Sequence, residues 1–176
     1  GAALLSMVGR LTVDKAGFED VRDRMRELTE RADAERVAFL DLADRDADAF
    51  REVMGAFRLP KATDDERTAR ILRIQEAYEG AAVVPLELAR RAVDLMELAE
   101  DATAIGNPNA ASDGYSGGAL LHAAALGAIA NVRINAAGLK DDAKAQGLVE
   151  ECDRLLERAA TLLGQLEEAF LLRLVP

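Results

Sequence analysis

The sequence predicts an all-α protein, an antiparallel bundle of five or six helices. Three observations carry this prediction. The composition is rich in Ala, Leu, Glu and Arg, no stretch alternates apolar and polar residues with a period of two, and every long segment repeats its apolar residues at a spacing of three and four. At 176 residues, half of them apolar, the chain is large enough for one domain with a core of its own.

Four stripes of apolar residues mark the long predicted helices in chain order. They run from Phe18 to Ala32, from Phe39 to Phe57, from Ile71 to Leu95 and from Leu148 to Phe170. A further helix, made largely of Ala, Gly and Leu, is predicted after residue 111. The apolar opening segment, residues 1–13, is too short to span a bilayer and carries Arg10.

Proline and capping residues set the boundaries in the first half of the chain. The residue before Pro60 avoids the α region, so one long helix is predicted to end there. Thr63 followed by Glu66 forms a capping box, which predicts the start of the next helix. Gly80 and Pro85 are expected to interrupt that helix, and Pro85 should kink it because it removes one backbone hydrogen bond.

Glycine-containing corners divide the second half of the chain. Gly106–Asn109 predicts a turn, and Ser112 or Asp113 is expected to cap the helix that follows it. Gly138–Asp142 predicts the last corner. Short connections of this kind favour antiparallel neighbours, and no linker or repeat divides the chain, so residues 1–176 are predicted to form a single domain.

Charge and composition exclude several classes of function. Lys and Arg total 22 against 32 Asp and Glu, and the net charge of −10 repels phosphate backbones and anionic headgroups, so neither a nucleic-acid nor a membrane partner is expected. One Cys and one His, Cys152 and His122, exclude a disulfide framework, a zinc cluster and a Ser–His–Asp site within one chain. With no targeting segment expected, the cytoplasm is the predicted location.

Asp46 is the candidate catalytic residue. It lies on the apolar stripe of its predicted helix, between Phe39 and Phe50, and should therefore face the core or a cleft within it. Asp44 and Asp48 lie about 200° around the helix and should face solvent. A carboxylate on such a stripe is a helix cap, half of a buried ion pair or a desolvated group suited to proton transfer, and position alone leaves these interpretations open.

Three further polar side chains are candidate binding residues. Asn131 and Asn135 continue a stripe of mostly small residues, and two amides one turn apart offer donors and acceptors that suit a planar heterocycle. From spacing alone, an interhelical hydrogen-bonded pair is the favoured interpretation. Lys61, beside Arg58, can attract an anionic ligand, although a lysine at a helix end needs no such explanation.

Several motifs together resemble one known family. Gly106–Asp113 (GNPNAASD) followed by Asn131–Asn135 (NVRIN) resembles the cyclodeaminase/cyclohydrolase family of folate one-carbon enzymes. Four more stretches match in order and spacing along nearly the whole chain: Asp44–Phe50, Phe57–Lys61, Ile74–Ala77 and Val84–Leu86. The family includes the cyclodeaminase half of formiminotransferase-cyclodeaminase and stand-alone methenyltetrahydrofolate cyclohydrolases.

The resemblance implies an all-helical homodimer that acts on a tetrahydrofolate derivative. The family's proposed catalytic aspartate falls on Asp46, the residue that is already anomalous on its stripe. We expect two sets of residues to bind substrate, the first orienting the pterin or the amide and the second shaping the site: Asn107, Asn109, Asn131 and Asn135, then Ser112 and Asp113. Lys61 is expected to bind the substrate's anionic part.

The implied reaction is cyclodeamination of 5-formiminotetrahydrofolate, which releases ammonia and forms 5,10-methenyltetrahydrofolate. The alternative is cyclohydrolysis of that product to 10-formyltetrahydrofolate, because both reactions pass through the same cation. A desolvated carboxylate supplies proton transfer and negative charge without a metal or cofactor, so none is expected. A non-catalytic helical dimer or scaffold is the third hypothesis. An Arg or Lys beside Asp46 would favour the scaffold, and an open cleft reaching Asp46 and the asparagines would favour the enzyme.

One departure from the family concerns the N-terminus. Members usually carry a Pro-Gly-Gly-Gly-Ser loop just before the first apolar helix, and this sequence begins after that loop, inside the helix. If the loop lines the folate site, a chain without it is expected to be incomplete or inactive.

Overall fold

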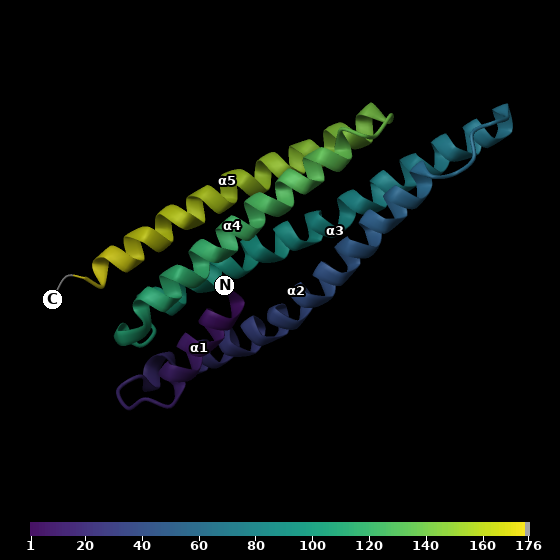
Figure 1. Cartoon of the computed structure of the whole chain (residues 1–176). Coiled ribbons are helices and arrows are strands. Elements are labelled where there is room, and N and C mark those ends of the chain that lie inside the picture. Colours follow the sequence, from purple (N-terminus) through teal and green to yellow (C-terminus); the bar gives the residue numbers. More distant parts are fainter. Residues whose placement is uncertain (175–176) are drawn as a thin grey trace.

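The computed structural model describes residues 1–174 and contains five α-helices (Figure 1). They are α1 (Ala2–Val13), α2 (Arg22–Phe57), α3 (Asp64–Ala104), α4 (Ala111–Ala136) and α5 (Asp142–Leu172). Two short 3₁₀ helices, η1 (Glu19–Val21) and η2 (Pro108–Ala110), precede α2 and α4. Within residues 1–174 there is no strand, so the predicted all-α fold is confirmed. The last two residues of the predicted domain lie outside the described ones.

The four long helices lie side by side, each antiparallel to the one before it along the chain (Figure 1). Helix α3 is central, because it packs against α2, α4 and α5. Helix α1 is much shorter and packs between α2 and α4 near one end of the bundle. The groove between α2 and α4 is therefore covered by α1 over only part of its length.

Two apolar clusters of unequal size form the interior. The larger one draws on all five helices and includes the inner face of α1, whose Leu5 and Val8 are fully buried. The smaller one lies between α2 and α3 at the other end, around Val53, Ile74 and Ala81. The end of the bundle that lacks α1 therefore has the thinner core.

Helix boundaries largely follow the predicted signals. Thr63 and Glu66 form the predicted capping box: the Glu66 amide donates to Thr63 Oγ1 at 3.2 Å, and the Glu66 carboxylate accepts from the Thr63 amide at 3.1 Å. The predicted interruption at Gly80 and Pro85 is wrong, because α3 continues through both residues. Packing against three neighbouring helices outweighs the local cost of one proline.

The predicted cap of α4 is also wrong. Neither Ser112 nor Asp113 caps this helix; its first turn follows η2 directly, and Ala110 stands at the capping position. Asn107 does the capping one step earlier, since its side-chain oxygen accepts from the Asn109 amide at 3.1 Å at the start of η2. The turn therefore ends in a 3₁₀ helix that continues into α4.

Helix α4 is apolar on nearly every side. The segment Pro108–Ala136 is long and apolar enough to cross a membrane by length and composition alone, and 39% of its most apolar stretch is buried within the bundle. Glycines bring its first half very close to α3: a Cβ added at Gly114 would stand 2.7 Å from Thr103 Oγ1, and one at Gly118 would stand 2.9 Å from the Ala99 Cβ. The same helix therefore serves the core and leaves an apolar outer face.

Candidate active site

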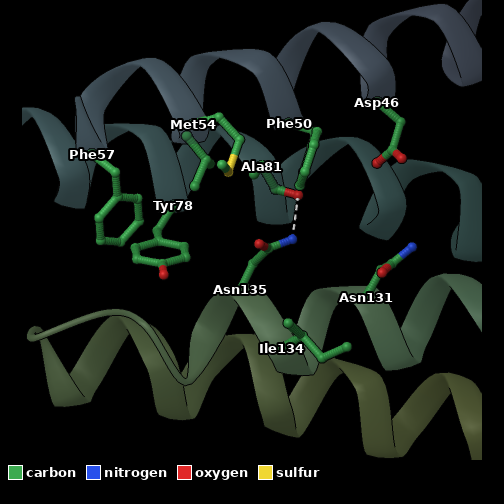
Figure 2. A pocket seen from close by; sticks show the side chains of 10 residues that line it. Asp46, Phe50, Met54, Phe57, Tyr78, Ala81, Asn131, Ile134 and Asn135 are labelled. Atoms are coloured by element: carbon green, nitrogen blue, oxygen red, sulfur yellow. Dashed lines mark hydrogen bonds between the residues drawn. The ribbon is translucent and has the colours of Figure 1, made fainter.

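A cavity of about 330 Å³ opens between α2, α3 and α4 at the end of the groove that α1 leaves uncovered (Figure 2). Ten residues line it: Asp46, Phe50, Val53, Met54 and Phe57 from α2, Tyr78 and Ala81 from α3, and Asn131, Ile134 and Asn135 from α4. Its size falls in the range of small-molecule sites, about 300–1,000 Å³, and its lining is mostly apolar with a few polar groups.

Asp46 is the only charged side chain among these ten residues. It is half-buried, whereas Asp44 and Asp48 are exposed, as the stripe predicts. Arg51 pairs with Asp48, and Arg45 pairs with Glu87 across the α2–α3 interface at 3.0 Å. Within residues 1–174, no Lys or Arg lies within ion-pair distance of Asp46 itself. The carboxylate thus borders an open cavity and is not held in an ion pair.

The two asparagines face this carboxylate from α4. Asn135 is half-buried, and its amide nitrogen donates to the backbone carbonyl of Ala81 on α3 at 2.9 Å. Asn131 lies one turn earlier, exposed at the cavity mouth. The sequence favoured an interhelical hydrogen bond for these asparagines. Asn135 does form one, and the acceptor is a backbone carbonyl of α3.

Aromatic rings form the remaining wall and were not predicted as site residues. Phe50 is 63% exposed at the cavity, and Phe57 meets Tyr78 edge to face with ring centroids 6.0 Å apart. Gly138 leaves room for Tyr78, because an added Cβ would stand 2.6 Å from the ring. The stripe itself carries a signal for them, because Phe50 and Phe57 follow the candidate carboxylate on it at one and three helical turns.

Met54 also lines the cavity. Its side chain is 39% exposed, whereas Met25 and Met96 are buried in the core. The difference arises because α1 covers Met25 and its surroundings but does not reach as far as Met54. Helical spacing gives all three methionines the same pattern and cannot tell a covered stretch of groove from an open one.

The second group of predicted site residues lies at the other end of α4. Asp113 and Asn131 are about 27 Å apart along the helix axis, at a rise of about 1.5 Å per residue. Asn109 and Ser112 are exposed, and Asp113 is half-buried. Within a single chain these residues therefore do not meet Asn131 and Asn135 in one site, and their role in substrate binding stays a prediction.

Asn107 forms several hydrogen bonds within the fold at that end of α4. It is buried, its side-chain nitrogen donates to the Leu11 carbonyl at 3.3 Å, and its side-chain oxygen accepts from Lys15 Nζ at 3.0 Å. Its backbone amide donates to Thr12 Oγ1 at 2.9 Å. These bonds tie the α3–α4 turn to the end of α1, so Asn107 is placed to hold the fold together.

Lys61 lies apart from both groups. It is exposed on the loop between α2 and α3 and does not line the cavity. Phe57, which lines the cavity, is the last residue of α2, so Lys61 follows four residues later on the loop. Among residues 1–174, no group of three or more His, Cys, Asp or Glu side chains is arranged to hold a metal ion.

Comparison with known proteins identifies the family of this fold and cavity. The family model described as formiminotransferase-cyclodeaminase matches residues 1–154, most of the chain. The chain belongs to this family. The family resemblance drawn from the sequence motifs is thereby confirmed.

Relatives in this family carry two different names. A methenyltetrahydrofolate cyclohydrolase of Methylorubrum extorquens is 38% identical over 92% of this chain and 78% of its own length. The formimidoyltransferase-cyclodeaminase of Rattus norvegicus is 34% identical over 95% of this chain, which spans only 32% of that longer protein. The crystal structure of a formiminotetrahydrofolate cyclodeaminase from Thermotoga maritima superposes with a TM-score of 0.84, at 29% identity, over 96% of this chain and 80% of that one.

Proposed function

We propose that this member of the family is a 5-formiminotetrahydrofolate cyclodeaminase with Asp46 as its catalytic residue. The observation that carries the proposal is a single carboxylate, without an ion-pair partner in residues 1–174, that faces two amides across an otherwise neutral cavity. One negative charge in neutral surroundings matches the single positive charge of the 5,10-methenyl cation. The cavity has room for the pterin end of the substrate, and the rings of Phe50 and Tyr78 offer it flat apolar contacts.

When the formimino group enters protonated, as its amidinium cation, protons and charge balance with the movement of one proton from N10 to the departing nitrogen. N10 attacks the formimino carbon and forms the new C–N bond; its proton must leave, and the departing nitrogen must gain a proton before the C–N bond breaks to release ammonia. Asp46 is suited to accept the N10 proton and to return it to the leaving nitrogen. The same carboxylate, once ionised, stabilises the cationic product.

Cyclohydrolysis of 5,10-methenyltetrahydrofolate is the second candidate function. It is favoured by the 38% identity to a stand-alone cyclohydrolase, of which this chain covers 78%. In this reaction water attacks the amidinium carbon, Asp46 accepts a proton from that water, and N5 takes a proton as its bond to the carbon breaks. Both reactions thus make the same demand on one carboxylate.

A substrate pair test decides between the two reactions. The purified chain is given 5-formiminotetrahydrofolate and 5,10-methenyltetrahydrofolate separately, and the methenyl chromophore is followed with Asp46→Asn as the control. Chromophore formed from the first substrate supports the cyclodeaminase, and accelerated loss of chromophore from the second supports the cyclohydrolase. If neither substrate is converted, including after the family's Gly-rich loop is added before Gly1, both proposals are overturned in favour of a helical scaffold.

We also propose that the chain works as a homodimer through the outward face of α4. This face is made of exposed apolar and small residues: Leu120, Ala123, Gly127, Ala130 and Ile134. Residues 114–132 contain no Lys, Arg, Asp or Glu, in a chain with a net charge of −10. Two copies with this charge repel each other, and an uncharged apolar face is where that repulsion is weakest and burial gains most.

A symmetric dimer would also unite the two groups of predicted site residues. If two copies of α4 pack antiparallel about a two-fold axis near Ala124, Asp113 of one copy meets Asn135 of the other, because both lie the same distance from the axis. Each cavity would then receive Asn109, Ser112 and Asp113 from the neighbouring copy. On this proposal the residues fail to meet within one chain because they belong to two.

Mixing two inactive variants tests this dimer. Asp46→Asn and Asp113→Ala should each be nearly inactive, and after unfolding and refolding together they should recover about a quarter of wild-type activity, since half the dimers then carry one intact site. Adding Gly127→Glu to both should abolish the recovery and leave monomers by sedimentation. Monomeric wild-type protein, or wild-type protein that binds lipid vesicles through α4, would overturn the proposal.

We also propose that the protein is cytoplasmic. The net charge of −10 and the single cysteine support this location.

A further inference from the structure

The carbonyl of Ala81, beside the cavity, lacks its usual partner within α3, and the sequence explains why. In an α-helix each carbonyl accepts from the amide four residues later, and the partner of Ala81 would be residue 85. That residue is Pro85, which has no N–H to donate. The carbonyl of Ala81 is therefore left free to accept a bond from outside α3.

Asn135 supplies the missing donor across the helix interface. Its side-chain amide lies 2.9 Å from the Ala81 oxygen, a good hydrogen-bond length (Figure 2). A carbonyl oxygen can only accept, so the atom facing it must be the NH₂ end of the amide. The planar amide then has its oxygen on the opposite side, turned in Figure 2 towards the side of the cavity where Tyr78 lies. Within residues 1–174 no group donates to that oxygen.

We propose that Pro85 is a positioning residue, which fixes the Asn135 amide so that its oxygen is presented to the ligand. The cavity then carries a hydrogen-bond acceptor of fixed direction on the side where Tyr78 lies (Figure 2). An acceptor locked in this way selects a ligand with an N–H donor at that point and excludes one with a second acceptor there. The identity of the ligand rests on the proposed function: a reduced pterin carries several N–H groups along its ring edge.

A simpler structural role would have the bond only repair the helix. In that case Asn135 serves α3, and removing the proline would make the bond unnecessary without any effect on the ligand. In the positioning role the proline orients Asn135, so removing it should affect how the ligand binds. The two roles differ in what happens to the Asn135 amide and to the Michaelis constant when residue 85 regains its N–H.

The first experiment observes the amide directly by ¹⁵N NMR of its NH₂ group, assigned through Asn135→Ala. Pro85→Ala is expected to fold, because alanine favours a helix interior. Its new N–H can bond to the Ala81 carbonyl within α3, so the NH₂ protons of Asn135 should exchange with water about tenfold faster than in the wild type. Val83→Ala, two residues earlier on the exposed side of α3, is the matched control and should leave the exchange unchanged.

The second experiment asks whether Pro85 acts through Asn135. Pro85→Ala should raise KM for the substrate about tenfold, the value of one hydrogen bond, and leave kcat within about twofold because Asp46 is untouched. In an Asn135→Ala background the same proline substitution should add nothing. Asn135→Asp, which has the same shape but cannot donate when ionised, should raise KM in a chain that keeps Pro85.

Two results would overturn the positioning role. One is an Asn135 amide that exchanges equally fast with and without Pro85. The other is a change in KM that is the same in the presence and absence of the Asn135 side chain. If neither folate substrate is turned over, the proposed function has failed, but the NMR comparison still decides whether Pro85 fixes the amide.

Discussion

The two halves of the groove between α2 and α4 are formed by the same pair of helices, but one half is filled and the other is open. In one half α1 fills the groove, and its Leu5 and Val8 are completely buried. In the other half nothing in residues 1–174 covers the groove, so Phe50 and Ile134 are 63% and 68% exposed. Within the described residues the covered half is a core and the uncovered half is a cavity, and the difference is whether α1 packs over it.

The contrast teaches where a site arises in a simple helical bundle. Small residues in the first half of α4, such as Gly117 and Gly118, let α1, α3 and α5 approach so closely that added Cβ atoms would collide with Leu5 or Leu166. In the second half larger and polar residues face the groove, and Asp46 opposes them from α2. A carboxylate there keeps contact with water and with a ligand, which the covered half would deny it.

The sharpest test of the uncovered half is Asp46→Asn. If Asp46 is the general acid and base, the rate should fall by about 10²–10⁴-fold, while the structure is retained because the side chain has the same shape. Steady-state kinetics on both folate substrates measure this effect. Asp48→Asn is the matched control, since Asp48 is exposed two residues away and pairs with Arg51. Full activity in Asp46→Asn would reject the assignment.

Leu5→Ala tests the covered half by opening it. Leu5 has no exposed surface and lies against Gly117, so its truncation should cost about 2–5 kcal/mol of the free energy of unfolding. Denaturant titration measures the loss. Leu40→Ala, at a 64% exposed position on α2, should cost far less. Equal costs at the two positions would mean that α1 does not dock as described.

Gly118→Ala tests the close approach that closes the covered half. The new Cβ would stand 2.3 Å from Leu166 Cδ2 and 2.9 Å from the Ala99 Cβ, so repacking should cost about 1–3 kcal/mol. Gly164→Ala on α5 has no atom within 4 Å of the new Cβ and should instead stabilise the helix by about 0.5–1 kcal/mol. Thermal unfolding of the pair should therefore shift in opposite directions, and a shared direction would contradict the packing.

The smallest expected effect is a pH dependence of α1 docking. Ser6 donates to Asp33 at 2.8 Å, and Arg10 pairs with the same carboxylate; these contacts lower the pKa of Asp33. Because the folded pKa lies below the unfolded one, their stabilisation is present above the ordinary value of about 4 and is lost as pH falls through the lowered pKa.

Comparing the wild type with Asp33→Asn isolates this effect from the other carboxylates. The difference between their unfolding midpoints should be constant near neutral pH and should shrink below about pH 4. Asp23→Asn, at a position whose side chain is 97% exposed, is the control and should differ little from the wild type at any pH. A difference that grows on acidification would contradict the predicted sign.

Much of the fold could be predicted from local signals, and the errors arose where tertiary packing overrode those signals. The capping box at Thr63 and the last corner near Asp141 are local, and both were found. The break at Pro85 and the cap at Ser112 were predicted locally as well, but packing and a distant asparagine overrode them. Asp46 was found because a charge on an apolar stripe is anomalous whatever covers it.

By itself, the sequence determined the helices, their order and the anomalous carboxylate, because hydrophobic period, proline and capping chemistry act within a few residues of each other. Only the tertiary structure decided which stretch of each stripe is covered and which stays open. It also separated the roles of two predicted binding residues: Asn107 is buried and ties the α3–α4 turn to α1, whereas Asn135 bonds to α3 beside the cavity. The reason is that the docking of α1 against α4 and the pairing of Asn135 with a carbonyl freed by Pro85 join residues more than fifty positions apart, which no local pattern encodes.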